Sequence, residues 1–412
     1  MMTNEVKNVP ELRFPDFNEE WKSEKLGNIS DRVRRKNQNL ESKMPLTISG
    51  NLGLVDQVTY FSKSVSAKNL ENYTLIKKGE FAYNKSYSNG YPLGAIKRLE
   101  KYDKGVLSTL YICFRFNENQ NTEYMKQYFE TSKWHKEVSA IAVEGARNHG
   151  LLNISVNEFF TILLSIPSLN EQNKIGDFFS KLDRQIELEE QKLSLLEEQK
   201  KGYMQKIFSQ ELRFKDENGN DYPNWIFEEL NNIFTKYQNT TYLHDNEEYK
   251  RISISNKGKI THRDITFGKR IGRKRQYLID LKKHPNTLTF IRQGVFLGGI
   301  GFIPSSLDGY IVTENMPLLS MSEEYSKKFM TYLFSSESYY KSVIFKNLPT
   351  GSAQKALHEK DWLKSFVNIP VYSEQEKIGN FFEKQDNLIK KQSDKVELLK
   401  ERKKGFLQKM FV

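Results

Sequence analysis

Four short polar stretches of the sequence carry the residue types that bind nucleic acid. Lys and Arg neutralise phosphates or grip the guanine edge, while Asn and Gln fit the adenine edge. The densest stretch, Lys269–Arg275, holds five Lys or Arg in seven residues. A solvated surface loop is the alternative for each stretch alone, so the interpretation depends on both halves of the chain carrying them. The candidate DNA-binding residues are Lys85, Ser86, Tyr87, Asn89, Arg147, Asn148, His149, Lys269, Arg270, Arg273, Lys274, Arg275, Thr350, Ser352, Gln354 and Lys355.

Catalytic and cofactor motifs are missing from the sequence. The string GGIGF at 298–302 lacks the third glycine and the strand–turn–helix frame of a dinucleotide site. Residues 15–22, PDFNEEWK, loosely resemble a nuclease site, but the carboxylates are close together and the later copy of this stretch loses the Glu-x-Lys pattern. Residues 216–221, DENGND, lack the terminal Glu of a calcium loop and predict a surface turn. We therefore expect neither catalysis nor a metal or cofactor in this chain.

Composition narrows the class of protein. The chain has 412 residues, a formal charge of +11, 38% hydrophobic residues and one cysteine. No apolar run reaches the ~18–20 residues of a membrane span, and the first residues have no apolar signal core. The lone Cys113, in an alternating strand-like run, predicts a buried thiol and excludes an internal disulfide or a Cys-based zinc site. We expect a cytoplasmic protein whose basic surface suits nucleic acid.

An internal repeat organises the rest of the chain. Glu171–Ile186 and Glu374–Ile389 share ten of sixteen residues at an offset of 203. A second block, ELRF…W, occurs at Glu11–Trp21 and again at Glu211–Trp225, with four extra residues in the later copy. The intervening sequences diverge apart from short echoes such as IKKGEF and IRQGVF. The predicted domains are globular domains at 1–165 and 211–368, with repeat helices at 166–210 and 369–412.

The repeated segments have the apolar spacing of a coiled coil. Steps of four and three residues continue for about four heptads, with polar interruptions such as Glu189 and Gln392. The predicted helix-pair seam consists of Ile175, Phe179, Leu182, Ile186, Leu193, Leu196 and Tyr203, with Ile378, Phe382, Ile389, Val396, Leu399 and Phe406. Helices of roughly 30 residues, ~45 Å long, would begin at Asn170-Glu171 and Ser373-Glu374 and pair antiparallel. The alternative is that each helix packs only on its own domain.

The divergent segments alternate short apolar runs with Gly, Asn and Ser, which is typical of twisted β-structure with some helices. The predicted fold class is therefore α+β, with two globular domains separated by two long helices that pair as an antiparallel coiled coil.

These features together resemble the DNA-specificity (S) subunit of type I restriction–modification systems. The resemblance is strongest in the repeated segments Ile166–Phe208 and Ile369–Phe411, and the strings at Gly79–Leu99 and Gly145–Ser155 support it. The resemblance implies two target-recognition domains, each reading one half of a split, asymmetric site in double-stranded DNA. It also implies that the helix pair sets the spacer and docks two methyltransferase subunits.

The resemblance further implies that S-adenosylmethionine belongs to the methyltransferase. Two restriction subunits, using ATP and Mg²⁺, can join the complex, and the S subunit has no catalysis of its own. Two alternatives stay open from the residues: a basic protein–protein scaffold, or a stand-alone enzyme that acts on DNA.

Overall fold

The computed structural model describes residues 8–62, 69–87, 90–142, 152–347 and 356–412. The chain divides into two compact units. Unit 1 comprises Met1–Glu190 and Asp394–Val412, and unit 2 comprises Gln191–Ser393. Each unit therefore contains the first half of one long helix and the second half of the other.

The two long helices are α6 (Leu169–Phe208) and α11 (Tyr372–Lys409), of 40 and 38 residues. Both exceed the predicted 30 residues, and both begin before the predicted caps. Ser168 accepts a hydrogen bond from the Glu171 amide at 3.4 Å, so the predicted cap, Asn170, lies inside α6. Each helix starts two residues after a proline, Pro167 or Pro370, because the restriction that proline places on a neighbouring residue falls on the residue before it.

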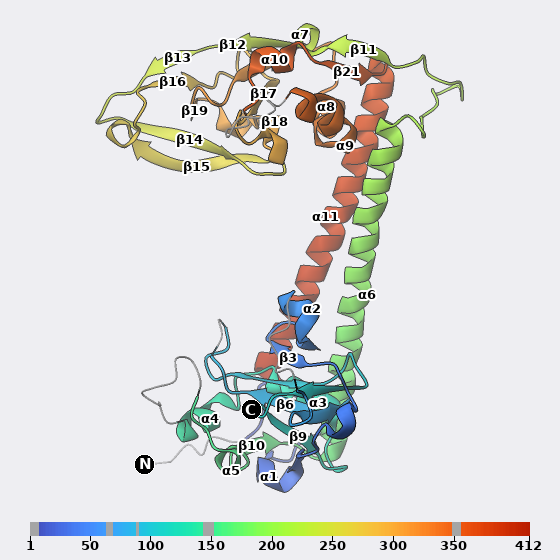
Figure 1. The fold of residues 1–412 in the computed structure, drawn as a ribbon, viewed down its shortest axis with the longest axis vertical. Helices are drawn as coiled ribbons and strands as arrows, with labels where there is room; N and C mark the ends of the chain where they lie inside the picture. The colour runs from blue at the N-terminus through green and yellow to red at the C-terminus, as the bar shows by residue number, and fades with distance from the viewer. Residues whose placement is uncertain (1–7, 63–68, 88–89, 143–151, 348–355) are drawn as a thin grey trace. The chain divides into compact units, whose positions relative to one another are not determined.

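Within each unit the two helices run antiparallel, which confirms the predicted helix pair (Figure 1). In unit 1, Asp183 pairs with Lys403 at 2.7 Å and Glu189 pairs with Lys395 at 2.5 Å, so numbers rise on one helix as they fall on the other. In unit 2, Lys200 pairs with Asp386 at 2.5 Å, and the ring of Tyr203 lies 5.1 Å from that of Phe381.

The predicted seam residues are buried or half-buried along both helices. Ile175, Phe179, Ile186, Ile378, Phe382, Val396 and Leu399 are buried, and Leu182, Leu193, Leu196, Tyr203, Ile389 and Phe406 are half-buried. The first seam residues of each helix belong to the core of the adjoining globular domain: Phe179 in unit 1 and Phe382 in unit 2. Each helix thus packs on its own domain at its start and on the other helix beyond.

Unit 1 is built on short antiparallel ladders around a core of aromatic residues. Its four-stranded sheet has the order β2 (Ser30–Arg32), β9 (Ile112–Phe116), β6 (Phe81–Asn84), β7 (Ala95–Arg98). The two-stranded ladders are β1 (Lys22–Lys25) with β10 (Leu163–Ile166), β3 (Leu46–Ser49) with β4 (Gly53–Asp56), and β5 (Thr74–Lys77) with β8 (Lys104–Leu107). Its short helices are α1 (Leu26–Ile29), α2 (Gln57–Phe61), α3 (Thr122–Phe129), α4 (His135–Ile141) and α5 (Val156–Phe159).

Unit 2 repeats this plan and enlarges it. Its four-stranded sheet has the order β12 (Phe234–Tyr237), β20 (Leu318–Met321), β17 (Thr287–Phe290), β18 (Ile300–Phe302), and β11 (Ile226–Glu229) pairs with β21 (Phe366–Ile369). A five-stranded sheet has the order β13 (Thr240–Tyr242), β16 (Arg275–Leu278), β19 (Ile311–Val312), β14 (Glu248–Ile254), β15 (Ile260–Phe267). Its short helices are α7 (Leu230–Ile233), α8 (Lys327–Ser335), α9 (Glu337–Tyr339) and α10 (Glu359–Leu363).

Matching sheet orders show which segments of the two units correspond. Strands β2, β9, β6 and β7 occupy the places of β12, β20, β17 and β18. The echo between IKKGEF and IRQGVF is therefore not a structural correspondence, because Ile76–Phe81 leads into β6 whereas Ile291–Phe296 follows β17. The mixed strands and helices of both units confirm the α+β prediction.

Candidate nucleic-acid interface

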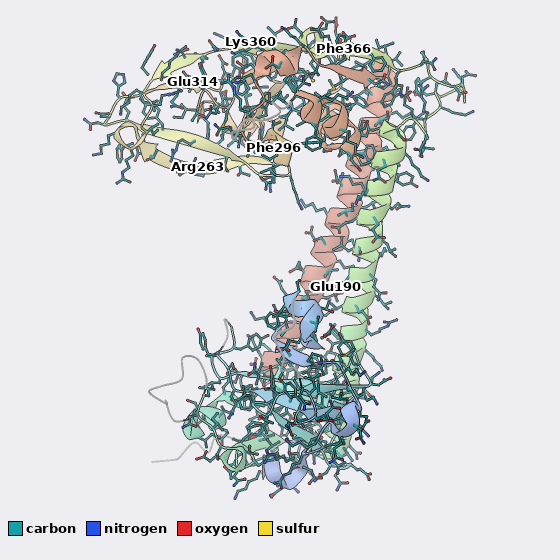
Figure 2. The ribbon with its side chains drawn as sticks, viewed as in Figure 1. Glu190, Arg263, Phe296, Glu314, Lys360 and Phe366 are labelled. Atoms are coloured by element: carbon teal, nitrogen blue, oxygen red, sulfur yellow. The ribbon has the colours of Figure 1, made fainter. Side chains whose placement is uncertain are left out.

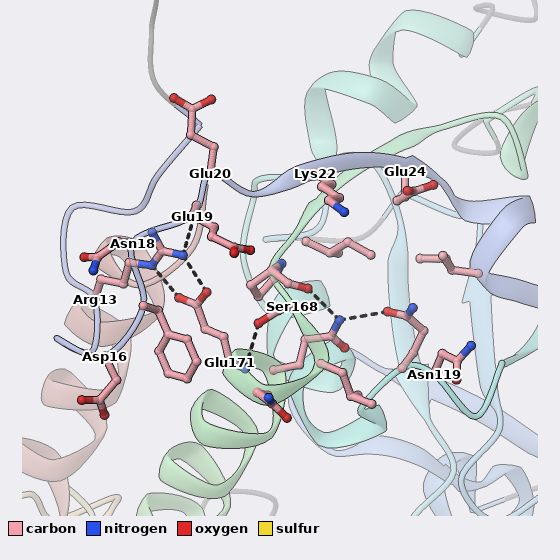
Figure 3. A pocket seen from close by; sticks show the side chains of 18 of the residues that line it. Arg13, Asp16, Asn18, Glu19, Glu20, Lys22, Glu24, Asn119, Ser168 and Glu171 are labelled. Atoms are coloured by element: carbon pink, nitrogen blue, oxygen red, sulfur yellow. Dashed lines mark hydrogen bonds and ion pairs between the residues drawn. The ribbon is translucent and has the colours of Figure 1, made fainter.

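Repeated charged residues tie each long helix to the segment that precedes its domain. Arg13 makes a bidentate pair with Glu171 at 2.7 Å and also donates to the Glu19 carbonyl at 2.6 Å, as Figure 3 shows. In unit 2, Arg213 makes the same pair with Glu374, with its shorter contact at 2.6 Å. Both carboxylate side chains are 1% exposed, so the ELRF repeat supplies the cation that a buried Glu requires.

The residue after each buried Glu ties the helix to a second helix of the domain. Gln172 accepts a hydrogen bond from the Asn121 amide at 3.0 Å, just before α3. Gln375 accepts one from the Ser326 amide at 2.9 Å, just before α8. One turn further on, a Cβ added at Gly176 would lie 2.7 Å from Asn121 Oδ1. The repeated sequences thus form the contact, called here the seat, between the start of each long helix and its adjoining globular domain.

The C-terminal end of each long helix packs on the globular domain that adjoins the start of the other long helix. Leu12 donates its amide to the carbonyl of Lys409, the last residue of α11, at 2.8 Å, and Leu212 donates to Lys206 of α6 at 3.0 Å. Phe411 packs against Trp21 in unit 1, with ring centroids 6.3 Å apart, and Phe208 packs against Trp225 in unit 2 at 6.4 Å. The repeats therefore have a structural role in both units.

The stretch that loosely resembled a nuclease site lines a polar pocket of about 670 Å³ in unit 1. Asp16, Glu20 and Lys22 are all at its wall, but Figure 3 shows their side chains pointing in different directions. Among the residues that the structure describes, no group of three or more His, Cys, Asp or Glu could hold a metal ion. The pocket therefore lacks the clustered carboxylates of a metal-dependent nuclease.

The single cysteine is an interior residue. Cys113 lies on β9 and is 2% exposed. Burial raises the pKa of its thiol to about 12, so almost no thiolate exists at neutral pH. This agrees with the predicted buried thiol and gives Cys113 no nucleophilic character.

Positive charge concentrates in the β-rich parts of both units. Residues 31–117 hold 15 Lys or Arg against seven Asp or Glu, and residues 236–316 hold 14 against seven. These two stretches carry +8 and +7, whereas the rest of the chain carries −4. A cationic surface on each divergent domain is the electrostatic requirement for contact with phosphates.

Only some of the candidate DNA-binding residues lie in the part of the chain that the structure describes. Asn89, Arg147, Asn148, His149, Thr350, Ser352, Gln354 and Lys355 lie outside them. In unit 1, Lys85 and Ser86 are half-buried and Tyr87 is 62% exposed, on the segment that follows β6. Tyr87 is thus the member of this group with a side chain that is open to a ligand.

Lys85 has a counterpart in unit 2 that the sequence did not reveal. The Lys85 carbonyl accepts the Leu152 amide at 3.0 Å, and its ammonium donates to the Ile154 carbonyl at 3.0 Å. The Arg292 carbonyl accepts the Leu357 amide at 2.9 Å, and its guanidinium pairs with Glu359 at 2.5 Å. Both cations therefore hold neighbouring chain segments in place, and the shared topology is the signal that identifies the pair.

The basic segment at 269–275 has a well-fixed backbone. Gly268 donates its amide to the Glu247 carbonyl, and Leu243 donates to the Lys274 carbonyl, both at 2.9 Å. The side chain of Gln276, which is 2% exposed, donates to the Arg273 carbonyl at 2.7 Å. A chain that is fixed in this way presents its cations in defined positions, unlike a mobile solvated loop.

The cations of this segment differ in their surroundings. The Lys274 ammonium pairs with Asp245, whose pKa it lowers through their hydrogen bond, and donates to the Gly268 carbonyl at 2.8 Å. Lys269 lies over the ring of Phe267 at 5.7 Å. Arg270 is exposed and has no ion pair with any residue that the structure describes. Arg273 and Arg275 both face Glu314, which Figure 2 labels in the part of unit 2 that holds the five-stranded sheet.

The glycines of the GGIGF string allow two backbones to meet. A Cβ at Gly298 would lie 1.8 Å from the Asn256 carbonyl oxygen, and one at Gly301 would lie 2.2 Å from the Gly258 carbonyl oxygen. The turn between β14 and β15 therefore packs directly on β18 and on the segment that joins β17 to β18. These glycines therefore serve the close packing of backbone segments.

Comparisons with known proteins agree with this architecture. Residues 18–198 match the family model of the Type I restriction modification DNA specificity domain. A chain from a structural study of assembly and conformational transition in the type I R-M system aligns with a TM-score of 0.53 at 16% identity, covering 95% of this chain and 97% of that one. The S subunit of a type I restriction–modification system from M. genitalium aligns with a TM-score of 0.53 at 14% identity, covering 98% and 99%.

No helix among the described residues is long and apolar enough to span a membrane. The family match covers the first domain and most of α6, and the solved chains share the fold across both units. Residues 18–198 therefore belong to the family of type I restriction modification DNA specificity domains, and the chain shares the fold of a solved S subunit across both units.

Proposed function

We propose that this chain reads a split DNA sequence for a methyltransferase complex without catalysing a reaction itself. The observation that carries this proposal is the concentration of positive charge in one stretch of each divergent domain, +8 over residues 31–117 and +7 over residues 236–316. Because these domains differ in sequence and in sheet composition, they would read unlike half-sites. The helices that both units share would fix the spacer between the two half-sites.

The experiment that tests the proposal is a map of methylated adenines. This chain is co-expressed with the methyltransferase encoded beside it, and genomic DNA is sequenced with detection of methylation. The expected result is a split, asymmetric motif that disappears when this chain is omitted. Unmodified DNA in the presence of an active, co-purifying methyltransferase would contradict the proposal.

Salt dependence separates DNA reading from a role as a protein scaffold. Phosphate contacts release counterions, so a protein that makes 6–10 of them loses roughly 10³–10⁵ in affinity between 50 and 200 mM salt. We expect the complex to show a slope in this range on a duplex that contains its motif. An affinity that does not change with salt would favour the alternative of a protein–protein scaffold. Turnover of DNA by this chain alone would favour the alternative of a stand-alone enzyme.

Two outward helix surfaces support methyltransferase docking. Leu195 on α6 is 63% exposed, and Leu398, its counterpart on α11, is 48% exposed. One heptad later, Gly202 and Gly405 have open space where a Cβ would lie. An interior helix glycine costs about 1 kcal/mol relative to alanine, and the chain's own packing does not require these two. We therefore assign each Leu–Gly surface to a helix of one methyltransferase subunit.

Substitution of the exposed leucines tests this docking. We expect Leu195→Glu to remove one of two bound methyltransferase subunits, and the double substitution with Leu398→Glu to remove both, as measured by the mass of the purified complex. Leu388→Glu is the matched control, because Leu388 is 49% exposed on α11 but its repeat counterpart is Gln185. Retention of two subunits by the double variant would refute the assignment.

A further inference from the structure

Glu314 holds two arginines on the exposed basic segment of unit 2. It follows β19, and its carboxylate hydrogen-bonds the Arg273 guanidinium and lies 3.9 Å from Arg275. The Arg273 side chain is 66% exposed. Exposed ion pairs contribute little to folding stability, so stability gives no strong reason to hold a guanidinium here.

The arrangement does orient Arg273. Its backbone carbonyl is held by the buried Gln276 amide, and its side chain is held by Glu314, so both ends of the residue are fixed. A guanidinium has five N–H donors in a rigid fork. The bond to Glu314 leaves donors free on an exposed group whose direction is already set, which reduces the ordering cost of binding.

The neighbouring cations are less suited to reading a base. The Lys274 ammonium is occupied by Asp245 and the Gly268 carbonyl. The Arg275 guanidinium lies over the ring of Tyr277, 6.0 Å from its centre. Arg270 is exposed without an orienting carboxylate among the described residues, which suits a phosphate contact that tolerates several geometries.

We propose that Arg273, oriented by Glu314, is a specificity-determining residue of unit 2 and binds the O6 and N7 atoms of a guanine in its half-site. Bidentate contact with these two acceptors is the commonest specific arginine contact in the major groove. Glu314 is a positioning residue in this arrangement. The inference rests on the proposed function, since it needs a DNA half-site read by unit 2.

The test compares methylation maps of Glu314→Gln, Arg273→Ala and the wild type, each co-expressed with the methyltransferase. Both variants are expected to lose discrimination roughly tenfold at one G·C pair of one half-site, while the other half-site stays unchanged. Glu314→Gln leaves Arg273 in place and removes a negative charge, so overall DNA affinity should not fall. Asp245→Asn is the matched control, because it makes the same charge change beside Lys274 and should leave the motif intact.

Each other outcome has a distinct meaning. An unchanged motif, or a uniform loss of methylation across that motif, would mean that Arg273 contacts phosphate or nothing, and would overturn the inference. Relaxation of the same base pair by Asp245→Asn would trace the effect to charge and would also overturn it. Arg273→Lys, at an exposed site that folding does not need, repeats the test if Glu314→Gln does not fold. A wild-type chain that directs no methylation would refute the proposed function itself, and the inference with it.

Discussion

One buried carboxylate in each unit helps to hold the globular domain on its long helix. Glu171 and Glu374 are each 1% exposed and each depends on one arginine from the ELRF repeat. Removing one partner of a buried pair leaves an uncompensated charge, which typically costs 3–5 kcal/mol. A buried ion pair of this kind gives the chain one defined seat for each domain, because only one arginine reaches each carboxylate.

We expect Arg213→Ala to lower the free energy of unfolding of unit 2 by about 3–5 kcal/mol, as measured by urea denaturation. Arg263→Ala is the control, because Arg263 lies in the same unit, is 59% exposed and pairs with Asp264 only at 3.7 Å. Its effect should stay within about 0.5 kcal/mol. Equal effects of the two substitutions would show that the Glu374 carboxylate does not need its partner.

Glu359 makes the stability of unit 2 depend on acid. Burial alone would raise the pKa of this carboxyl, but hydrogen bonds from Lys236 and Arg292 outweigh it and lower the pKa to about 2. The stabilisation is therefore present above the unfolded pKa, near 4.3, and is lost as the pH falls through the folded value.

Glu359→Gln removes that dependence. We expect the variant to be less stable than wild type at pH 6 by on the order of 3 kcal/mol, and the difference to shrink as the pH falls from about 4 toward 2. Urea denaturation at pH 6, 4 and 2.5 checks this. A difference that stays constant across this range would mean that the titration of Glu359 is not coupled to folding.

At the scale of elements, the sequence predicts the features that depend on residues close together in the chain, such as the two long helices. The a/d spacing locates α6 and α11 as helices with a pairing face, because heptads are local. The order of the sheets could not be predicted, since it depends on pairings between distant strands such as β11 and β21. The basic segment was visible, but Glu314, which lies 41 residues after Arg273, was not recognised as its partner.

The two repeated glycines of α6 should respond in opposite ways to alanine. A Cβ at Gly176 would lie 2.7 Å from Asn121 Oδ1 and 3.1 Å from the Tyr124 amide, so Gly176→Ala should destabilise unit 1 by about 1–3 kcal/mol. Gly202 has open space, so Gly202→Ala should stabilise the isolated chain by about 1 kcal/mol. Thermal unfolding of both variants measures the difference, and destabilisation by Gly202→Ala would show that Gly202 packs closely against another part of the chain.

At the scale of the whole molecule, each long helix is divided between the two units. If these helices set the DNA spacer, four residues inserted after Lys192 should lengthen the spacer and leave both half-sites unchanged in a methylation map. Four residues inserted at the exposed turn around Asn218 are the control and should alter neither. A spacer that does not change with the helix insertion would refute the role of these helices in setting it.

The division of the chain into units also sets an order of events during translation. Unit 2 is one continuous stretch, Gln191–Ser393, whereas unit 1 needs Asp394–Val412 to complete its seat with Phe411. At 5–20 residues per second, the ribosome needs roughly 10–40 s to synthesise the 203 residues of unit 2. The first domain to be synthesised is therefore the last to be completed. In that interval, an open aromatic core around Trp21 and Tyr124 is exposed to chaperones and proteases, and this domain would suffer first when a nascent chain is cut short.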